Sequence, residues 1–282
     1  MTPPVRIAAA LAASLLFALS AAAQTAAQQA KPYEPQIGQA GKDVIWVPTP
    51  DEVVDRMLTM AQVTKDDLVY DLGAGNGKIA IAAAKKFGAR SVGIEYNPDM
   101  AKHAQGNVEA AGVAARAKIV QGDIFATNFS EATVVTMYLL PGLNMKLRPT
   151  ILAMKPGTRI VSHSFTMEDW EPDEISIMDG RRAYFWVVPA NVGGSWQLES
   201  GADRHELAFD QRFQKIEGSV NLGATTQAGL RDARLRGFHI SFALVDGSGV
   251  LKTYTGRVAG GRMEGGWRGD NGTEGRWSAT KK

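Results

Sequence analysis

A glycine-rich turn and three acidic residues are the part of this sequence whose types and spacing can bind a ligand. The apolar run 68–72 contains Asp71 and leads into the turn 73–77, and an alanine-rich segment with helical character follows. The next two apolar runs lead to Glu95 and Asp123. A strand, a tight turn and a helix in succession bring backbone N–H groups close to a nucleotide-like ligand.

The spacing of the glycines within the turn differs from that of a dinucleotide-binding turn. The glycines form the pattern Gly-x-Gly-x-Gly, and Lys78 stands where a dinucleotide-binding turn carries its third glycine. Gly73 permits a positive φ in a sharp turn, while Gly75 and Gly77 let the backbone approach a ligand closely. Taken alone, these glycines are also compatible with a simple connection between a strand and a helix.

The three acids occupy equivalent places in successive elements. Glu95 lies about 20 residues beyond the turn, a spacing typical of a carboxylate that accepts hydrogen bonds from ribose hydroxyl groups. Each acid alone is typical of a solvated loop. The carboxyl ends of parallel strands share one edge of a sheet, however, and ligands bind at that edge. The sequence therefore predicts a ligand site formed by Asp71, Glu95 and Asp123.

The elements that must position these residues alternate between strand and helix, which predicts an α/β fold with a Rossmann-like seven-stranded sheet. We expect strands near 68–73, 91–96, 117–122, 134–139 and 157–165, helices near 78–87, 98–112 and 142–154, and a closing hairpin of strands near 174–179 and 183–189. Thr49, Pro50 and Glu52 form a capping box, which predicts a first helix with Thr49 as its N-cap.

After Pro189 the composition changes to dense glycine and short alternating runs. About eight short strands are expected over 190–282, forming a small all-β domain with a lipocalin-like barrel. Its interior can bind an apolar ligand, or it can be filled by its own aromatic side chains, and the small size of the barrel favours the second interpretation.

The composition narrows the classes of function. The chain has 282 residues, a net charge of +2 and no cysteine, so it offers no charge argument for nucleic acid and no disulfide or thiol nucleophile. The four histidines are scattered, and no metal site is indicated. Arginines at 231, 234 and 236 are better explained by a solvated strand face than by a nucleic-acid site.

The first residues predict export to the bacterial periplasm. Arg6 precedes an apolar run over 7–19, and small residues at 20–23 suggest a signal peptide (1–23) that is cleaved near Ala23. An uncleaved membrane anchor is the alternative, although the run is short for a membrane span. The composition of the segment 24–42 is typical of a disordered linker, so ordered structure is expected to begin near Asp43.

The chain resembles the class I (seven-stranded) S-adenosylmethionine (SAM)-dependent methyltransferases. The resemblance rests on the strings 46–50, 71–77 and 121–125 together with Glu95. Through 138–149 and 162–165 the chain is similar to the lysine methyltransferases that modify the c-subunit of ATP synthase. The resemblance covers a methyltransferase domain over 43–189 and leaves the barrel and the export signal outside.

The resemblance implies SAM as the cofactor. It assigns ribose binding to Glu95 and adenine binding to Asp123. It assigns binding of the methionine part of SAM to the glycine turn and its neighbours: Thr49, Asp71, Gly73, Gly75 and Gly77. It also implies methyl transfer to a protein lysine, with a small molecule as the other possible acceptor. In that case the protein mainly aligns and desolvates the reacting groups.

Tyr138 and Asn144 are the candidate catalytic residues, because both can orient a methyl acceptor. His163, at the end of the fifth parallel strand, is a candidate base. Packing and capping roles explain the same three residues, since buried polar groups normally find structural partners. The chain lacks the Asn/Asp-Pro-Pro-Tyr motif of amine-directed methyltransferases near Tyr138, which argues against adenine or glutamine as the acceptor.

A second hypothesis is an exported binding protein without catalysis. It would use the methyltransferase fold as a scaffold and the barrel for an apolar ligand or a partner. SAM is made in the cytosol, so the export signal favours this alternative, whereas the three acids and the glycine turn favour the enzyme.

Overall fold

The computed structural model describes residues 33–223 and 227–282. The expected signal peptide (1–23) and the first part of the expected linker (24–32) lie outside the described residues. None of the helices in the described ranges is long and apolar enough to cross a membrane.

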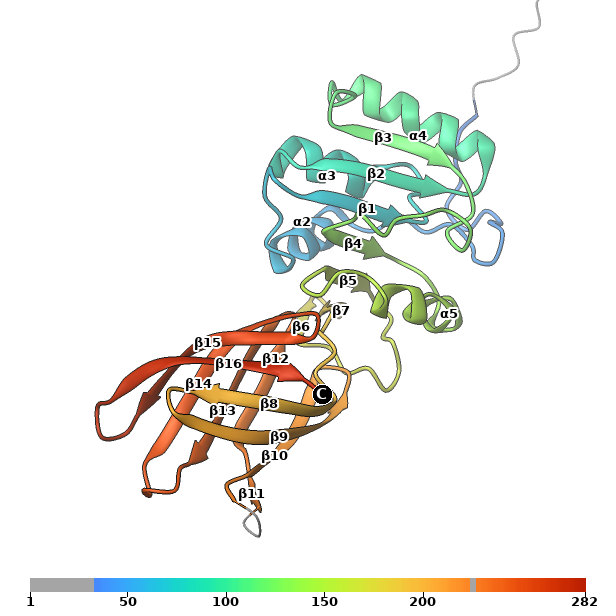
Figure 1. Cartoon of the computed structure of the whole chain (residues 1–282). Coiled ribbons are helices and arrows are strands. Elements are labelled where there is room, and N and C mark those ends of the chain that lie inside the picture. Colours follow the sequence, from blue (N-terminus) through green and yellow to red (C-terminus); the bar gives the residue numbers. More distant parts are fainter. Residues whose placement is uncertain (1–32, 224–226) are drawn as a thin grey trace, which may run out of the picture. The chain divides into compact units, whose positions relative to one another are not determined.

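A seven-stranded sheet carries the acids and the glycine turn (Figure 1). Its strands are β1 (Leu68–Leu72), β2 (Arg90–Glu95), β3 (Ala117–Gln121), β4 (Val134–Met137), β5 (Arg159–His163), β6 (Glu174–Met178) and β7 (Arg181–Val187). The order is β3-β2-β1-β4-β5-β7-β6, with the first five strands parallel and β7 antiparallel to β5 and β6. The predicted α/β architecture with a closing hairpin is confirmed.

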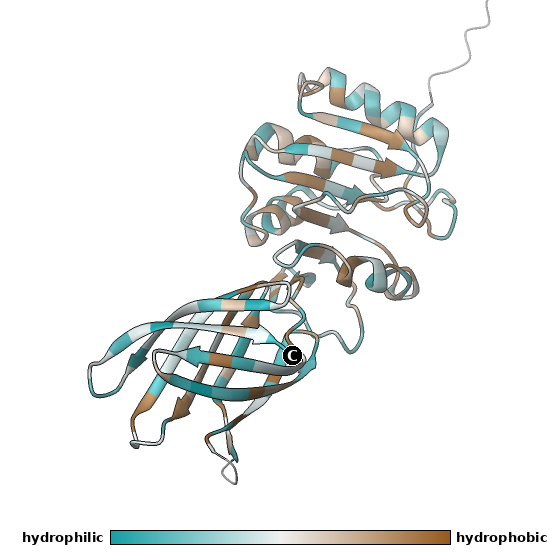
Figure 2. Cartoon of the chain, in the orientation of Figure 1, coloured by the Kyte–Doolittle hydropathy of each residue, from teal (hydrophilic) through white to brown (hydrophobic). Residues whose placement is uncertain are grey.

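Helices precede or connect most of the parallel strands. The helix α2 (Asp51–Met60) precedes β1, and α3 (Lys78–Phe87), α4 (Pro98–Ala110) and α5 (Pro141–Leu152) connect β1 to β2, β2 to β3 and β4 to β5, whereas residues 122–133 join β3 to β4 without a helix. Each residue of β1 and of β4 is buried, as expected for central strands with both faces covered. In Figure 2 the strands of this sheet carry much brown, whereas teal covers much of α4. Residues 164–173, which join β5 to β6, contain no helix.

The start of α2 differs from the prediction. Pro50 is the N-cap, no side chain caps the helix, and Glu52 pairs with Arg181 instead of closing a capping box. The hydroxyl of Thr49 lies 3.3 Å from Nδ1 of His163, so Thr49 faces the carboxyl edge of the sheet rather than the end of the helix.

The segment 33–42 also differs from the expected linker. Residues 38–46 form a hairpin. The N–H of Gly38 donates to the carbonyl of Trp46 at 2.8 Å, and the N–H of Trp46 donates to the carbonyl of Gln39 at 2.9 Å. We call residues 38–46 the strap. Its order comes from contacts with distant parts of the chain, which the local composition does not reveal.

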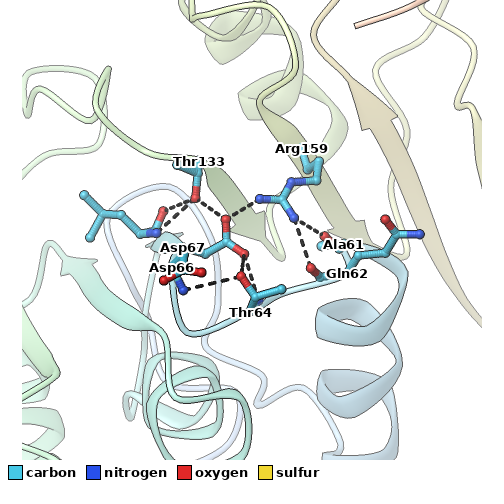
Figure 3. A network of polar contacts seen from close by, with 8 residues as sticks. Ala61, Gln62, Thr64, Asp66, Asp67, Thr133 and Arg159 are labelled. Carbon is cyan, nitrogen blue, oxygen red and sulfur yellow. Dashed lines mark hydrogen bonds and ion pairs between the residues drawn. The ribbon is translucent and has the colours of Figure 1, made fainter.

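The carboxylate of Asp67 joins the segments that lead into β1, β4 and β5 at the amino edge of the sheet (Figure 3). Thr133 donates to Asp67 at 2.7 Å, the N–H of Thr64 donates to it at 2.8 Å, and Arg159 forms an ion pair with it. Burial alone would raise the pKa of Asp67, but these hydrogen bonds and the charge of Arg159 outweigh burial and lower it. The ionised carboxylate therefore joins the segments that lead into β1, β4 and β5.

The C-terminal part is a nine-stranded antiparallel sheet, one strand more than the approximate number expected. Its strands are β8 (Gly194–Ser200), β9 (Asp203–Arg212), β10 (Lys215–Asn221), β11 (Gln227–Gly229), β12 (Arg231–Arg236), β13 (His239–Val245), β14 (Leu251–Ala259), β15 (Arg262–Gly269) and β16 (Glu274–Lys281). The N–H of Leu230 donates to the carbonyl of Gly218 at 2.8 Å, which brings the β12 end of the sheet to β10 and nearly closes a barrel.

Aromatic side chains occupy the inner face of the barrel. The rings of Phe242 and Tyr254 stack with centroids 5.1 Å apart, and Trp277 meets Tyr254 edge-on at 5.8 Å. Trp196 is fully buried in the same cluster. Figure 2 shows the corresponding alternation of brown and teal along the barrel strands. This packing agrees with the interpretation of an interior filled by the chain's own side chains.

The turn between β9 and β10 contacts the part of the chain that carries the seven-stranded sheet. The indole N–H of Trp170 donates to the side chain of Gln214 at 2.9 Å, and the ring of Phe213 stacks on Trp170 with centroids 5.9 Å apart. Trp170 belongs to the segment that joins β5 to β6. A turn of the second sheet thus covers the place where that segment lacks a helix.

Candidate functional site

A cavity of about 300 Å³ lies at the carboxyl edge of the seven-stranded sheet. The glycine turn, the ends of β1 and β2, the segments after β3 and β4, and residues 39–49 form its walls. Its volume is at the lower end of the range for small-molecule sites, about 300–1,000 Å³. The predicted residues that line it are Thr49, Asp71, Gly73, Gly75, Glu95, Asp123 and Tyr138.

The glycine turn has the backbone that the sequence predicts. Gly73, Gly75 and Gly77 have φ angles of 79°, 54° and 80°, in the left-handed region that favours glycine. The N–H groups of Gly73 and Ala74 donate to the carbonyl of Ile94 at 2.9 Å, which ties the turn to β2. Gly77 lies outside the cavity wall: a Cβ there would meet Ile119 at 3.3 Å, so this glycine permits close packing of α3.

Asp71 is buried beneath the turn. Its side chain is 3% exposed and accepts a hydrogen bond from Thr136 at 2.8 Å. Burial raises the pKa of this carboxyl to about 7, the nearby Glu95 adds to the rise, and the hydrogen bond from Thr136 opposes it. A cationic group at this end of the cavity would favour the ionised form.

Backbone donors hold Glu95 in a defined orientation. One carboxylate oxygen accepts from the N–H of Gly75 at 2.9 Å, and the other accepts from the N–H of Asn97 at 3.0 Å. A carboxylate offers about four acceptor positions, so two remain for hydroxyl donors from a ligand. This set of acceptors fits a ribose diol.

Asp123 lies at the far side of the cavity. It accepts from the N–H of Phe125 at 2.9 Å and from Nζ of Lys42 at 2.7 Å. The hydrogen bond with Lys42, followed by that with Phe125, lowers the pKa of Asp123, so the carboxylate is ionised. Ile124 beside it supplies an apolar wall. An acceptor next to an apolar wall fits a purine ring with an exocyclic amino group.

Aromatic rings surround Tyr138 at the end of β4. The ring of His163 lies 4.0 Å from that of Tyr138, and Phe165 stacks on Tyr138 with centroids 6.1 Å apart. Burial lowers the pKa of His163 to about 4, and the charge of Arg181 adds to the shift. His163 is therefore neutral at physiological pH, and a role as general base in the neutral range does not fit it.

Asn144 does not line the cavity. It is fully buried, and its side-chain amide donates to the backbone carbonyls of Thr166 at 3.1 Å and Phe165 at 3.4 Å. Asn144 thus holds the segment that carries Phe165. Asn144 shows the structural contacts that were the alternative interpretation, and its role in orienting an acceptor stays a prediction.

Several wall residues lie outside the predicted set. Trp46 and Lys42 come from the strap, Phe165 follows β5, and Leu140 and Leu143 come from the start of α5. Trp46 is the first residue of the string 46–50, and Leu140, Leu143 and Phe165 lie within the strings 138–149 and 162–165, so the resemblance was the available signal for all four. Lys42 lies outside these strings and offered none.

The arrangement fits SAM. The turn with left-handed glycines, the buried acid below it, the oriented carboxylate of Glu95 and the acid beside an apolar wall correspond in order to the parts of this cofactor. Among residues 33–223 and 227–282, no group of three or more metal-ligating side chains is present.

The comparisons with known proteins agree with this geometry. The family model described as "ANTKMT methyltransferase domain" matches residues 71–174. A protein-lysine N-methyltransferase of Saccharolobus islandicus is 48% identical over 151 residues, which are 51% of this chain and 94% of that protein. The human lysine N-methyltransferase named for the c-subunit of ATP synthase is 28% identical over 132 residues, 46% of this chain and 56% of that protein.

A solved structure extends the comparison to a bound ligand. It is described as an RNA methyltransferase from Salinibacter ruber in complex with S-adenosyl-L-homocysteine. This chain is 50% identical to it, with a TM-score of 0.51 over 52% of this chain and 96% of that one.

The sheet order, the cavity and a relative matched over nearly its whole length lead to one assignment. The chain belongs to the class I SAM-dependent methyltransferases, and SAM is its cofactor.

Proposed function

We propose that the chain transfers the methyl group of SAM to the ε-amino group of a lysine in a protein. The observation that carries the proposal is the apolar, aromatic part of the cavity wall formed by Tyr138 and Phe165, with the neutral His163 packed against the ring of Tyr138. Bound SAM supplies a methyl group on a positively charged sulfonium. The chain's part is to present an unprotonated amine in line with that methyl group.

A lysine must lose a proton before its nitrogen has a free electron pair. Burial in apolar surroundings lowers the pKa of an amine, and the rings of Tyr138 and Phe165 with Leu140 and Leu143 provide such surroundings. The proton lost beforehand goes to solvent. The nitrogen then forms the new N–C bond as the electron pair of the C–S bond goes to sulfur, so the positive charge passes from sulfur to the methylated ammonium. The hydroxyl of Tyr138, which lines the cavity, is the group we assign to orienting the amine.

Exposed apolar side chains at the cavity mouth support a protein as the acceptor. Ile45, Val47 and Leu140 are 63%, 40% and 46% exposed and all three line the cavity. Apolar groups gathered on a surface are typical of sites where another macromolecule binds. The names of the Saccharolobus islandicus and human relatives give lysine as the residue that those proteins methylate, which also supports lysine as the acceptor here.

The test uses purified chain, SAM with a labelled methyl group and a cell extract as a source of acceptors. We expect label in a fraction that proteinase K removes and RNase leaves, and mass spectrometry should find it on lysine. The Tyr138→Phe variant should transfer more slowly while binding SAM normally. Label that RNase removes, or label on another residue type, would contradict the proposal.

A further inference from the structure

The strap forms a wall of the cofactor cavity and is a small folded unit of its own. Besides the two hydrogen bonds between Gly38, Gln39 and Trp46, the N–H of Gly41 donates to the carbonyl of Val44 at 2.8 Å. A Cβ at Gly41 would lie 2.5 Å from that carbonyl oxygen, so the tight turn requires glycine. The strap is therefore a hairpin held by hydrogen bonds of its own.

Two side chains attach the strap to opposite sides of the cavity. The indole of Trp46 lies on the glycine turn, where a Cβ built on Gly75 would approach Nε1 to 2.4 Å. Lys42 forms its ion pair with Asp123 at 2.7 Å, and its Nζ lies 4.7 Å from the ring centroid of Tyr96. One attachment is at the methionine side and the other is at the adenosine side.

The attachment through Lys42 is weak enough to be reversible. The side chains of Lys42 and Asp123 are 38% and 29% exposed. Exposed ion pairs of this kind change an equilibrium by no more than about fivefold, and salt screens them. Asp123 is also the acid that the cofactor's adenine is expected to contact, so the same carboxylate serves both the ligand and the strap.

We propose that the strap is a gate for cofactor exchange, with Lys42 as its latch and Trp46 as its contact with the glycine turn. Opening the latch frees the adenosine side of the cavity for SAM to enter and for the demethylated product to leave. Closing it places the strap across the bound cofactor.

Exchange kinetics in the full chain test the gate. We would measure association and dissociation rates of S-adenosylhomocysteine by stopped flow, at low and high salt, for wild type and Lys42→Ala. A loosened gate speeds both entry and exit, so we expect both rates to rise about two- to fivefold at low salt. High salt should accelerate the wild type toward the rates of the variant. Lys65→Ala, which removes an exposed pair with Asp66, is the matched control and should change neither rate.

Unchanged rates in Lys42→Ala would overturn the proposal. A faster dissociation with an unchanged association rate would overturn it as well, because that pattern describes a direct ligand contact instead of a gate.

Hydrogen exchange gives an independent measurement. The amide protons of Gly38, Gly41 and Trp46 form the bonds of the strap and its turn. We expect S-adenosylhomocysteine to slow exchange over 38–46 in the wild type. In the free protein, Lys42→Ala should accelerate exchange in the same segment, because a hairpin released from Asp123 loses the contact that supports its hydrogen bonds. Exchange that responds neither to the ligand nor to the substitution would contradict a moving strap.

Discussion

Asp71 links the charge of one side chain to cofactor binding. It lies beneath the glycine turn with 3% of its surface exposed, and burial raises the pKa of its carboxyl to about 7. The methionine part of SAM carries a cationic amino group, which favours the ionised carboxylate. A protonated Asp71 must therefore lose its proton as the cofactor binds.

This linkage predicts that SAM affinity rises with pH. Below the pKa of about 7 the free protein holds the proton that binding must release, so affinity should increase by up to about tenfold per pH unit and level off above about pH 8. Titration calorimetry in buffers of different ionisation enthalpy would count the released proton. A constant affinity between pH 6 and pH 8 would show that Asp71 does not meet the cationic group.

Asp71→Asn should stabilise the fold and weaken cofactor binding. The pKa is higher in the folded chain, about 7, than in the unfolded chain, so the stability from this carboxyl is complete at low pH and is lost as pH rises through 7. Removing the charge at pH 8 should raise the free energy of unfolding by up to about 4 kcal/mol, and at pH 4 the change should be small. The asparagine oxygen can still accept the hydrogen bond from Thr136.

Urea unfolding at the two pH values measures the first effect, and calorimetry with SAM measures the second, for which we expect a loss of at least about tenfold. For the urea measurement alone, Glu95→Gln is the control on the neighbouring strand, because this carboxylate is only half-buried and its removal should not change stability differently at the two pH values. Equal effects of Asp71→Asn on stability at pH 4 and pH 8 would rule out the explanation from burial.

At the scale of the elements, the two edges of the seven-stranded sheet carry polar clusters with different tasks. Asp67 and its partners Thr133 and Arg159 join the segments that enter the strands. Asp71 and Glu95 lie at the ends where β1 and β2 terminate and line the cavity. The acid at one edge thus stabilises the fold, and the acids at the other edge line the cavity that we assign to the cofactor.

Arg159→Met should therefore lower stability without affecting the site. The substitution leaves the buried Asp67 with fewer partners and removes a donor to the carbonyl of Ala61. We expect a loss of about 2–3 kcal/mol in the free energy of unfolding, measured with urea, and an unchanged affinity for SAM. The control is Arg90→Met at the same edge, an exposed arginine that should change stability by less than about 0.5 kcal/mol.

The elements also show what the sequence can predict. The apolar runs that became β1 to β5 and the glycine turn are recognisable because neighbouring residues alone determine them. The strap is different: its composition is that of a linker, and its order depends on Asp123, which lies 81 residues from Lys42. Asn144 was predicted at the site but supports it from behind, because the direction of its side chain depends on the packing of α5.

For the whole molecule, the turn between β9 and β10 joins the two sheets. Phe213 stacks on Trp170, and Gln214 accepts from the same indole. Phe213 also packs against the core cluster that contains Trp186 and Tyr184 of β7. The segment that lacks a helix is therefore completed by a residue of the barrel, which couples the stability of the two parts.

Phe213→Ala should weaken this coupling. Loss of a half-buried phenylalanine should cost about 1–3 kcal/mol, and the aromatic site around Tyr138 should keep its affinity for SAM. Differential scanning calorimetry should record one cooperative transition for the wild type and a lower midpoint for the variant. Two well-separated transitions in the wild type would contradict a shared core.

We also propose that the chain is exported, on the basis of the apolar run 7–19 and the small residues before Gln24. When the full gene product is made in a bacterial host, mass spectrometry of the periplasmic fraction should find Gln24 as the first residue. A protein that retains Met1 and stays in the cytosolic fraction would refute this proposal.

The strap has a practical consequence for handling the protein. It begins at residue 38, and the chain that precedes it is joined directly to the hairpin beside the glycine turn. A purification tag or a fluorescent protein fused directly before residue 38 would add mass to the segment that the proposed gate moves during cofactor exchange. A fusion after Lys282 is attached at the end of β16 in the barrel instead, so it is the arrangement that leaves measured cofactor kinetics undisturbed.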